Sequence, residues 1–204
     1  EACVDFAFKS PNPVITIEFQ GGEPLLNWKV FVAATLYARK KSKSSGKDLR
    51  LALVSNFSLM TEEKAGFLLK NEVSICTSLD GPAGLHNSNR AFPGGDSHAV
   101  TARWLRYFRK KHDDQSGGYK VFKPGALLTV TRQSLARPEE IINEYVRLGL
   151  EEIFIRPLAP LGYAKTRWGE IGYDAADFIK FYRKSLDYII RLNRGGVRFR
   201  EKMA

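Results

Sequence analysis

A short turn early in the chain carries residue types that could bind a cationic ligand. The turn Gly21–Pro24 follows an apolar, β-branched run over 14–19 and precedes an amphipathic segment that begins near Trp28. This order predicts a strand, a loop and a helix. Two adjacent glycines let the backbone approach a bound molecule, and Glu23 offers a carboxylate to a group such as an ammonium ion. The alternative is a tight turn with a solvated glutamate.

Four further polar clusters follow apolar segments in the same way: Ser55-Asn56, Ser78-Leu79-Asp80-Gly81, Thr129-Val130-Thr131 and Arg156-Pro157. The carboxyl ends of parallel strands converge on one rim when right-handed crossovers join the strands. We therefore expect a single concavity for a polar ligand of moderate size, lined by Gln20 to Glu23, Ser55-Asn56, Ser78 and Arg156.

The elements that position these clusters alternate between short apolar strands and helices. We expect strands over 14–19, 49–54, 73–77, 125–131 and 152–155, and helices over 28–41, 97–111, 137–148 and 174 to about 193, with one more starting at Thr61. Polar loops are expected over 43–47 and 82–96, and a flexible connector over 113–118. Strand and helix thus alternate five times, which predicts an α/β protein with a parallel sheet.

Length and composition bound the class of protein. With 204 residues and 44% hydrophobic content, the chain can bury one sizeable core in one domain. It has no run of 18 apolar residues and no basic start typical of a signal peptide, so we expect no membrane association. Only two cysteines occur, which is typical of a reducing cytoplasm rather than of a disulfide framework. A first residue other than methionine indicates a piece of a longer protein.

The net charge of +10 raises the question of nucleic acid. The basic runs lie over 39–43, 109–111 and 191–200, at or just past predicted helix ends, where cations complement the helix dipole. Single-strand binders interleave basic and aromatic residues along a strand, a pattern that this sequence does not have. We therefore expect solvated helix ends and no specific nucleic-acid partner.

Three stretches, in this order, resemble the core motifs of radical S-adenosylmethionine (SAM) enzymes. They are Glu-Phe-Gln-Gly-Gly-Glu-Pro-Leu-Leu over 18–26, Ser55-Asn56, and Ser-Leu-Asp-Gly-Pro with His-Asn-Ser-Asn-Arg over 78–90. The chain is similar to the peptide-maturing branch that includes anaerobic sulfatase maturases. The amino-acid sequence over 10–13 and 154–164 is most similar to that of the maturases of His-Xaa-Ser peptide systems. The resemblance spans nearly the whole chain.

The resemblance implies a partial, open β/α barrel of the radical SAM type, with SAM bound beside a four-iron four-sulfur cluster. It assigns the methionyl amino group to Gly21, Gly22 and Glu23, with Pro24 in the same turn, and the ribose and carboxylate to Ser55, Asn56 and Ser78. Arg156 lies on the same rim. It also suggests Asp80 and Arg90 as cofactor-binding residues, although Asp80 could simply form a turn and Arg90 could pin the long loop through a carboxylate.

The cysteines depart from the family pattern. A CxxxCxxC loop after the first strand supplies three thiolates to the cluster in the family, whereas Cys3 falls in a helical segment and Cys76 in a strand, where we expect a core residue. We expect the first strand and the cluster loop to lie upstream, so that residues 1–204 cover about strands 2 to 6 and ligate no metal. An auxiliary-cluster domain is not expected within the chain either. Glu201 matches the catalytic base of the sulfatase branch poorly.

Two functions remain open on this basis. The first is the core of a peptide maturase that, when intact, accepts an electron from a donor, cleaves SAM to a 5′-deoxyadenosyl radical and abstracts hydrogen from a peptide or protein substrate. The second is a homologue without the cluster that binds SAM or a peptide and performs no catalysis. A nucleic-acid-binding domain ranks last.

Overall fold

The structure is a computed structural model that describes residues 1–92, 95–114 and 118–203. The chain divides into two compact units. Unit 1 comprises Glu1–Thr77 and Tyr107–Pro124, and unit 2 comprises Ser78–Arg106 and Gly125–Ala204. Each unit is described by itself below.

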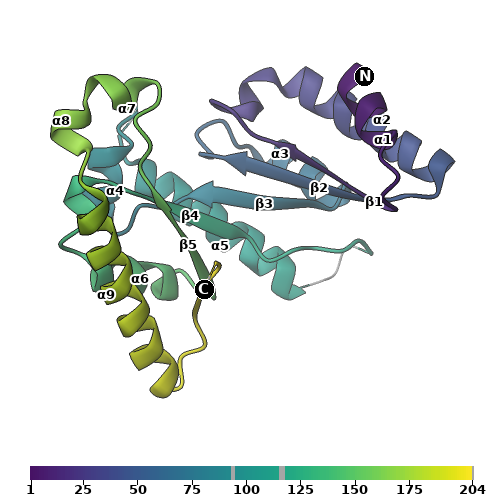
Figure 1. Cartoon of the computed structure of the whole chain (residues 1–204). Helices are drawn as coiled ribbons and strands as arrows, with labels where there is room; N and C mark the ends of the chain where they lie inside the picture. The colour runs from purple at the N-terminus through teal and green to yellow at the C-terminus, as the bar shows by residue number, and fades with distance from the viewer. Residues whose placement is uncertain (93–94, 115–117, 204) are drawn as a thin grey trace. The chain divides into compact units, whose positions relative to one another are not determined.

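The described residues form six strands of an open α/β sheet in the order β1-β2-β3-β4-β5-β6 (Figure 1). The strands are β1 (Val14–Phe19), β2 (Asp48–Ser55), β3 (Val73–Ser78), β4 (Gly125–Val130), β5 (Glu152–Pro157) and β6 (Arg200–Glu201). The pairs β1–β2, β2–β3, β4–β5 and β5–β6 are parallel. The α/β class and five strands are confirmed. The sequence did not predict β6, because two residues are too few to show a period.

In unit 1, helices α2 (Trp28–Ser45) and α3 (Glu62–Lys70) cover one face of β1 and β2 (Figure 1). An aromatic cluster joins them: the ring of Phe31 lies 4.4 Å from that of Phe19 on β1 and 6.4 Å from that of Phe67 on α3. On the opposite face, Thr16 and Glu18 are exposed. One buried face and one polar face follow from the alternation of side chains along a strand.

The ends of these helices follow local capping rules. The Thr61 hydroxyl accepts a hydrogen bond from the backbone N–H of Lys64 and begins α3, as predicted. The predicted end of α2 at residue 41 and the loop over 43–47 were wrong, because the helix continues to Ser45, whose hydroxyl donates to the carbonyl of Lys41. It ends at Gly46, which adopts a left-handed conformation with φ +69°. The short helix α1 (Ala2–Phe8) packs on α2 and carries Cys3.

Unit 2 is built on β4, β5 and β6 with α6 (Pro138–Arg147) and α9 (Ala175–Arg194), which pack on each other. Its fully buried side chains include Leu128, Ile141 and Tyr145. Two short helices, α7 (Tyr163–Thr166) and α8 (Trp168–Ile171), follow β5. Asp174 occupies the predicted N-cap of α9, although its side chain makes no capping hydrogen bond.

The stretch predicted as a loop over 82–96 contains a helix, α4 (Ala83–Asn89), so that prediction was wrong. Only Leu85 and His86 of α4 are buried, so the segment has no apolar stripe to indicate a helix. Helix α5 (Ser97–Asp114) follows and extends the predicted 97–111. Pro93 and Gly94 of the predicted loop, and residues 115–117 of the predicted connector, lie outside the described residues.

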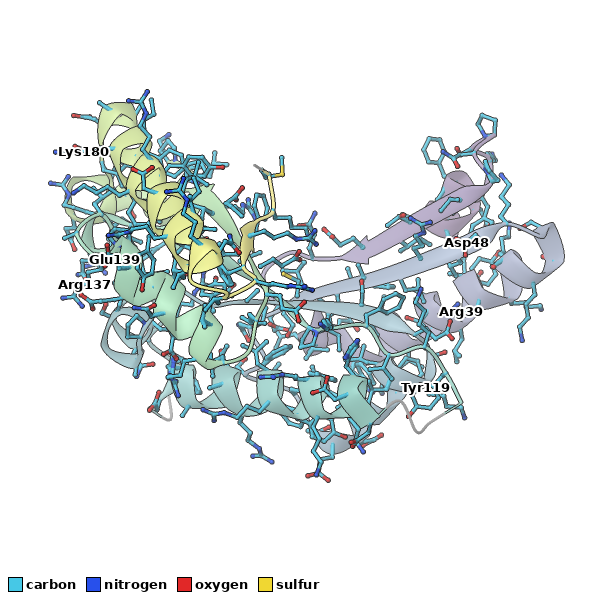
Figure 2. The ribbon with its side chains drawn as sticks, turned by 90° about the horizontal axis from the view of Figure 1, so that it is seen from below. Arg39, Asp48, Tyr119, Arg137, Glu139 and Lys180 are labelled. Carbon is cyan, nitrogen blue, oxygen red and sulfur yellow. The ribbon has the colours of Figure 1, made fainter. Side chains whose placement is uncertain are left out.

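Charged side chains lie on or next to the outer helices (Figure 2). Examples are Arg39 on α2 in unit 1, and Glu139 on α6 and Arg137 just before α6 in unit 2. Arg39 lies 3.6 Å from the carboxylate of Glu72, and Glu139 pairs with Arg191. Basic residues in the last turns of α2, α5 and α9 agree with the prediction that the basic runs lie at helix ends. Within the described ranges, the helices are all too short or too polar to cross a membrane.

Candidate functional site

The turn after β1 holds Glu23 in a defined position. Its Oε1 accepts hydrogen bonds from the backbone N–H of Leu25 at 3.0 Å and from the hydroxyl of Ser55 at 2.8 Å. Its Oε2 accepts from the backbone N–H of Asn56 at 2.8 Å. The carboxylate thereby caps the short 3-10 helix η1 (Pro24–Asn27) and links the ends of β1 and β2. The alternative interpretation, a tight turn with a solvated glutamate, is therefore wrong.

The end of β2 is equally constrained. Ser55 is 3% exposed, and its hydroxyl donates to Glu23 while accepting from the backbone N–H of Phe57 at 3.0 Å. Phe57 has φ +62°, a conformation that costs a bulky L-residue about 1–2 kcal/mol. Its fully buried ring, 5.9 Å from that of Phe108, holds the residue there. Asn56 is exposed, and its Oδ1 accepts from the backbone N–H of Ser58 at 2.9 Å.

The residues of this turn suit the ammonium end of SAM. A carboxylate offers about four acceptor positions, and the three hydrogen bonds on Glu23 leave one for a further donor. Gly21 has φ +143°, which L side chains rarely adopt. A Cβ built on Gly21 or Gly22 meets no atom within 4 Å, so the backbone of the turn is open to an approaching molecule. Pro24 occupies the first position of η1, where its missing N–H costs nothing.

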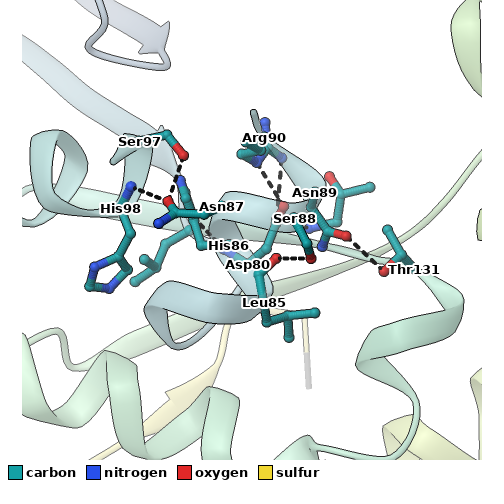
Figure 3. A network of polar contacts seen from close by, with 12 residues as sticks. Asp80, Leu85, His86, Asn87, Ser88, Asn89, Arg90, Ser97, His98 and Thr131 are labelled. Carbon is teal, nitrogen blue, oxygen red and sulfur yellow. Dashed lines mark hydrogen bonds and ion pairs between the residues drawn. The ribbon is translucent and has the colours of Figure 1, made fainter. Parts of the chain in front are cut away.

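In unit 2, Asp80 is part of a buried clamp (Figure 3). Its carboxylate accepts from Nε of Arg90 at 2.7 Å and from Nη2 at 3.2 Å, and it also accepts from the backbone N–H of Thr129 at 3.2 Å. The Asp80 side chain is 2% exposed and that of Arg90 29%. Gly81, with φ +124°, makes the turn, because a Cβ there would lie 2.9 Å from Ile141. The expectation that Arg90 pins this segment through a carboxylate is confirmed.

Five consecutive side chains at the end of α4 make polar contacts around this clamp (Figure 3). The Nδ1 atom of His86 accepts from the backbone N–H of Asp80, and Oδ1 of Asn87 accepts from Ser97 and from the N–H of His98. The hydroxyl of Ser88 donates to Oε1 of Gln133, and Oδ1 of Asn89 accepts from the hydroxyl of Thr131. Arg90 is the fifth residue, through its contact with Asp80. Neither His86 nor Asn87 was predicted as a site residue, because the sequence alone does not show which residues their side chains contact.

A second buried pair lies beside this network. Nε2 of His98 is 2.7 Å from Oε1 of Glu144, and Arg147 donates to both oxygens of that carboxylate. Burial raises the pKa of Glu144, but the hydrogen bonds from Arg147 and His98 outweigh it and lower the pKa overall. Glu144 is therefore ionised at neutral pH and compensated within unit 2.

The remaining predicted residues lie at strand ends. Ser78 is half-buried at the last position of β3, and Arg156 is exposed on β5, opposite Thr129 on β4. The structure thus brings Glu23, Ser55 and Asn56 together in unit 1. In unit 2 it joins Asp80 to Arg90. The single concavity that would combine all of these residues stays a prediction.

The described residues do not by themselves supply the ligands of an iron–sulfur cluster. Among the described residues there is no group of three histidine, cysteine, aspartate or glutamate side chains that could hold a metal ion. Cys3 is exposed on α1, and Cys76 is half-buried on β3. The expectation that Cys76 is a core residue was wrong, because Val73, Ile75 and Thr77 occupy the buried face of the strand and Cys76 points to the other.

Comparisons with known proteins show which structures and sequences this chain is similar to. No family model matches the chain. The structure of anSMEcpe with bound AdoMet and the Kp18Cys peptide superposes with a TM-score of 0.84 over 99% of this chain and 54% of that chain, at 22% sequence identity. The fold is therefore that of the core of this radical SAM maturase.

Sequence comparison identifies relatives of this chain. The chain is 25% identical over 205 residues to a cysteine-type anaerobic sulfatase-maturating enzyme of Clostridium perfringens, which covers 98% of this chain and 53% of the relative. It is 25% identical over 113 residues to the radical SAM cyclopropyl synthase TigE of Paramaledivibacter caminithermalis, covering 55% of this chain and 23% of the relative. The chain is homologous to these enzymes, which confirms the resemblance, and it spans about half the length of the sulfatase-maturating relative.

Proposed function

We propose that this chain is the SAM-binding core of a radical SAM peptide maturase. The single observation that carries the proposal is the Glu23 carboxylate, fixed by Leu25, Ser55 and Asn56 beside two open glycines, with one acceptor position left. Homology to a sulfatase-maturating enzyme and to a cyclopropyl synthase supports the reaction class.

The roles of the residues follow from their chemistry. Glu23 takes the ammonium group of SAM, and the turn at Gly21 and Gly22 lets that group approach the backbone. The side-chain amide of Asn56 and the hydroxyl of Ser78 offer hydrogen bonds to the ribose and the carboxylate. Arg156, exposed at the end of β5, offers a cation to the same carboxylate. Ser55, Asp80 and Arg90 support the site through the contacts that they already make.

The intact protein would need more than this chain holds. A four-iron cluster, when bound elsewhere in the protein, supplies the electron that cleaves SAM. A peptide or protein is the proposed substrate, supported by the Kp18Cys peptide bound in the structure of anSMEcpe. The proposal extends to an electron donor and to the cytoplasm, because cluster thiolates require reducing conditions. This chain alone is proposed to be inactive.

A non-catalytic homologue that binds SAM or a peptide is the second candidate, and the two cysteines of the chain favour it. The two candidates share the SAM site and differ in the cluster. The sequence that precedes Glu1 in the intact protein separates them: a CxxxCxxC triplet supports the enzyme, and its absence there supports the binding module.

Substitution of Glu23 tests the cofactor site. In the intact protein, Glu23→Ala is expected to weaken SAM binding by about tenfold or more, since one charge-assisted hydrogen bond contributes about 1.5–3 kcal/mol. Isothermal titration with SAM measures the affinity. Glu18→Ala is the matched control, because Glu18 is exposed on β1, the strand that precedes the turn, and the substitution is expected to leave the affinity within about twofold. Equal affinities of the two variants would remove the basis for this SAM site.

Reconstitution with iron and sulfide tests the division of labour. This chain is expected to remain colourless, without the broad absorption near about 400 nm that thiolate-held clusters give. The reason is that Cys3 and Cys76 lie on different elements and neither has a second thiolate beside it in the described part of the chain. A stoichiometric four-iron cluster on this chain would contradict the proposal.

A further inference from the structure

We propose that His86 is a positioning residue that fixes Asp80 and, through Asp80, the ends of β3 and β4. The proposal rests on the proposed function in one respect, because Ser78 at the end of β3 is a residue which that function assigns to SAM. His86 itself contacts no ligand in this account. It acts through the segment that follows Ser78.

The contact between His86 and Asp80 joins two buried residues. The backbone N–H of Asp80 donates to Nδ1 of His86 at 3.2 Å, and both residues are 1% exposed. Burial lowers the pKa of His86 to about 4, so the imidazole is neutral at neutral pH. Because Nδ1 accepts a hydrogen bond, the proton of the neutral ring lies on Nε2. A protonated ring would have no acceptor at Nδ1.

Asp80 in turn connects two strands. Its carboxylate accepts from the N–H of Thr129 in β4, and the adjacent N–H of Leu79 donates to the carbonyl of Leu127 in β4 at 2.9 Å. The carbonyl of Leu79 also accepts from the hydroxyl of Tyr145 at 2.6 Å. The segment just after Ser78 is thus held by β4 on one side and by α6 on the other.

The imidazole is a rigid support because α4 is anchored beyond it. Asn87 accepts from the hydroxyl of Ser97 at 2.9 Å and from the N–H of His98 at 2.8 Å, which ties α4 to the start of α5 (Figure 3). Asn89 accepts from the hydroxyl of Thr131 at 3.2 Å. The rings of His86 and His98 meet edge to face at 5.8 Å. These contacts oppose a movement of His86 together with Asp80.

Other roles for a buried histidine agree less well with these contacts. A metal ligand needs further donors, and the described residues hold no group of three that could bind a metal. A general acid or base must reach a substrate proton, whereas His86 is 1% exposed and its Nδ1 is occupied by Asp80. Positioning is the role that uses the contact actually present.

Two substitutions of His86 separate the hydrogen bond from the volume of the ring. His86→Leu fills the site but removes the acceptor, whereas His86→Asn places an amide oxygen close to the position of Nδ1. His112→Leu and His112→Asn are the matched controls, since His112 lies on α5 outside this network and its Nδ1 lies 3.2 Å from the carboxylate of Asp113. All four variants are made in this chain.

Amide hydrogen exchange, measured by NMR at neutral pH, is the primary readout. In His86→Leu, exchange at Asp80 and Thr129 is expected to accelerate roughly fivefold to a hundredfold, the range for a buried donor that loses its acceptor. His86→Asn is expected to restore most of the protection. The amide of Ile155 is the internal reference, because it donates to the carboxylate of Glu201 at 3.2 Å and lies outside the network. An equal acceleration at Ile155 would indicate general destabilisation and would overturn the proposal, as would unchanged exchange at Asp80.

SAM binding to the intact protein is the second readout. If the wild type binds SAM, His86→Leu is expected to weaken binding several-fold, His86→Asn to recover it, and the His112 variants to leave it unchanged. Altered exchange at Asp80 with unchanged SAM affinity would overturn the link to the cofactor site. If the wild type itself does not bind SAM, the proposed function fails, and hydrogen exchange alone decides whether His86 fixes Asp80.

Discussion

Glu23 in unit 1 and Asp80 in unit 2 both follow a strand of the parallel sheet, yet their surroundings differ. Glu23 is half-buried, accepts three hydrogen bonds and lies next to two glycines with open space above them. Asp80 is buried, and its carboxylate is shared between a guanidinium group and a backbone N–H. The first carboxylate can accept a cation from outside, whereas the second is already paired. Position at a strand end therefore does not by itself make a carboxylate a ligand.

Removal of the Asp80 carboxylate gives the largest expected loss of stability. Asp80→Ala leaves the Arg90 guanidinium and the Thr129 N–H without their acceptor, and we expect the free energy of unfolding to fall by about 2–4 kcal/mol. The value lies below that for a fully buried pair because Arg90 is 29% exposed and water can solvate it in part. Urea denaturation measures the loss.

Asp48→Ala is the control for this substitution. Asp48 lies at the start of β2 (Figure 2). Its side chain is 61% exposed and pairs with Arg50 at 3.4 Å. Exposed ion pairs contribute little, so the free energy of unfolding should change by less than about 0.5–1 kcal/mol. Similar losses for the two variants would break the distinction between a paired and a solvated carboxylate.

The pH dependence of stability tests the neutral state of His86. Burial lowers the pKa of His86 to about 4 in the folded chain, whereas the ordinary pKa of a histidine in water is 6.5. The unfolded chain binds the proton first as the pH falls, so stability is lost between about pH 6.5 and 4. Between pH 7 and 5 we expect a loss of about 2 kcal/mol from this group alone.

His86→Asn isolates this component, since asparagine does not titrate. The groups that act on His86 electrostatically are Asp80, Arg90, His98 and Asp96, and all four remain in the variant. The difference in unfolding free energy between wild type and His86→Asn should therefore change by about 2 kcal/mol from pH 7 to 5. A constant difference would mean that His86 titrates normally and that the buried network tolerates its charge.

Local sequence patterns account for the sheet but not for these contacts. The strands of residues 14–19 and 49–54 were predictable because apolar residues alternate with others and end at Gly21 and at Ser55-Asn56. Helix α4 was not, because its polar side chains are stabilised by partners that lie just after β4, in α5 and in the turn at Asp80. The hydrogen bond from Ser55 to Glu23 joins residues 32 positions apart, a distance that no local pattern encodes.

The two glycines give smaller expected effects on stability than Asp80, and they sharpen the comparison. Gly21 has φ +143°, so Gly21→Ala should lower the free energy of unfolding by about 1–2 kcal/mol through backbone strain. Gly22 has no positive φ, and a Cβ there meets no atom within 4 Å, so Gly22→Ala should stay within about 0.5 kcal/mol of wild type.

Gly22→Ala then serves as a probe of the space itself. Its methyl group would enter the open volume beside Glu23 without disturbing any packed atom of the chain. If SAM approaches the backbone there, the variant should bind SAM at least several-fold more weakly in the intact protein while its unfolding curve matches that of the wild type. Unchanged binding in a fully stable Gly22→Ala protein would show that the cofactor does not use this face of the turn, and the carboxylate of Glu23 would then be a link between β1 and β2, as Asp80 is between β3 and β4.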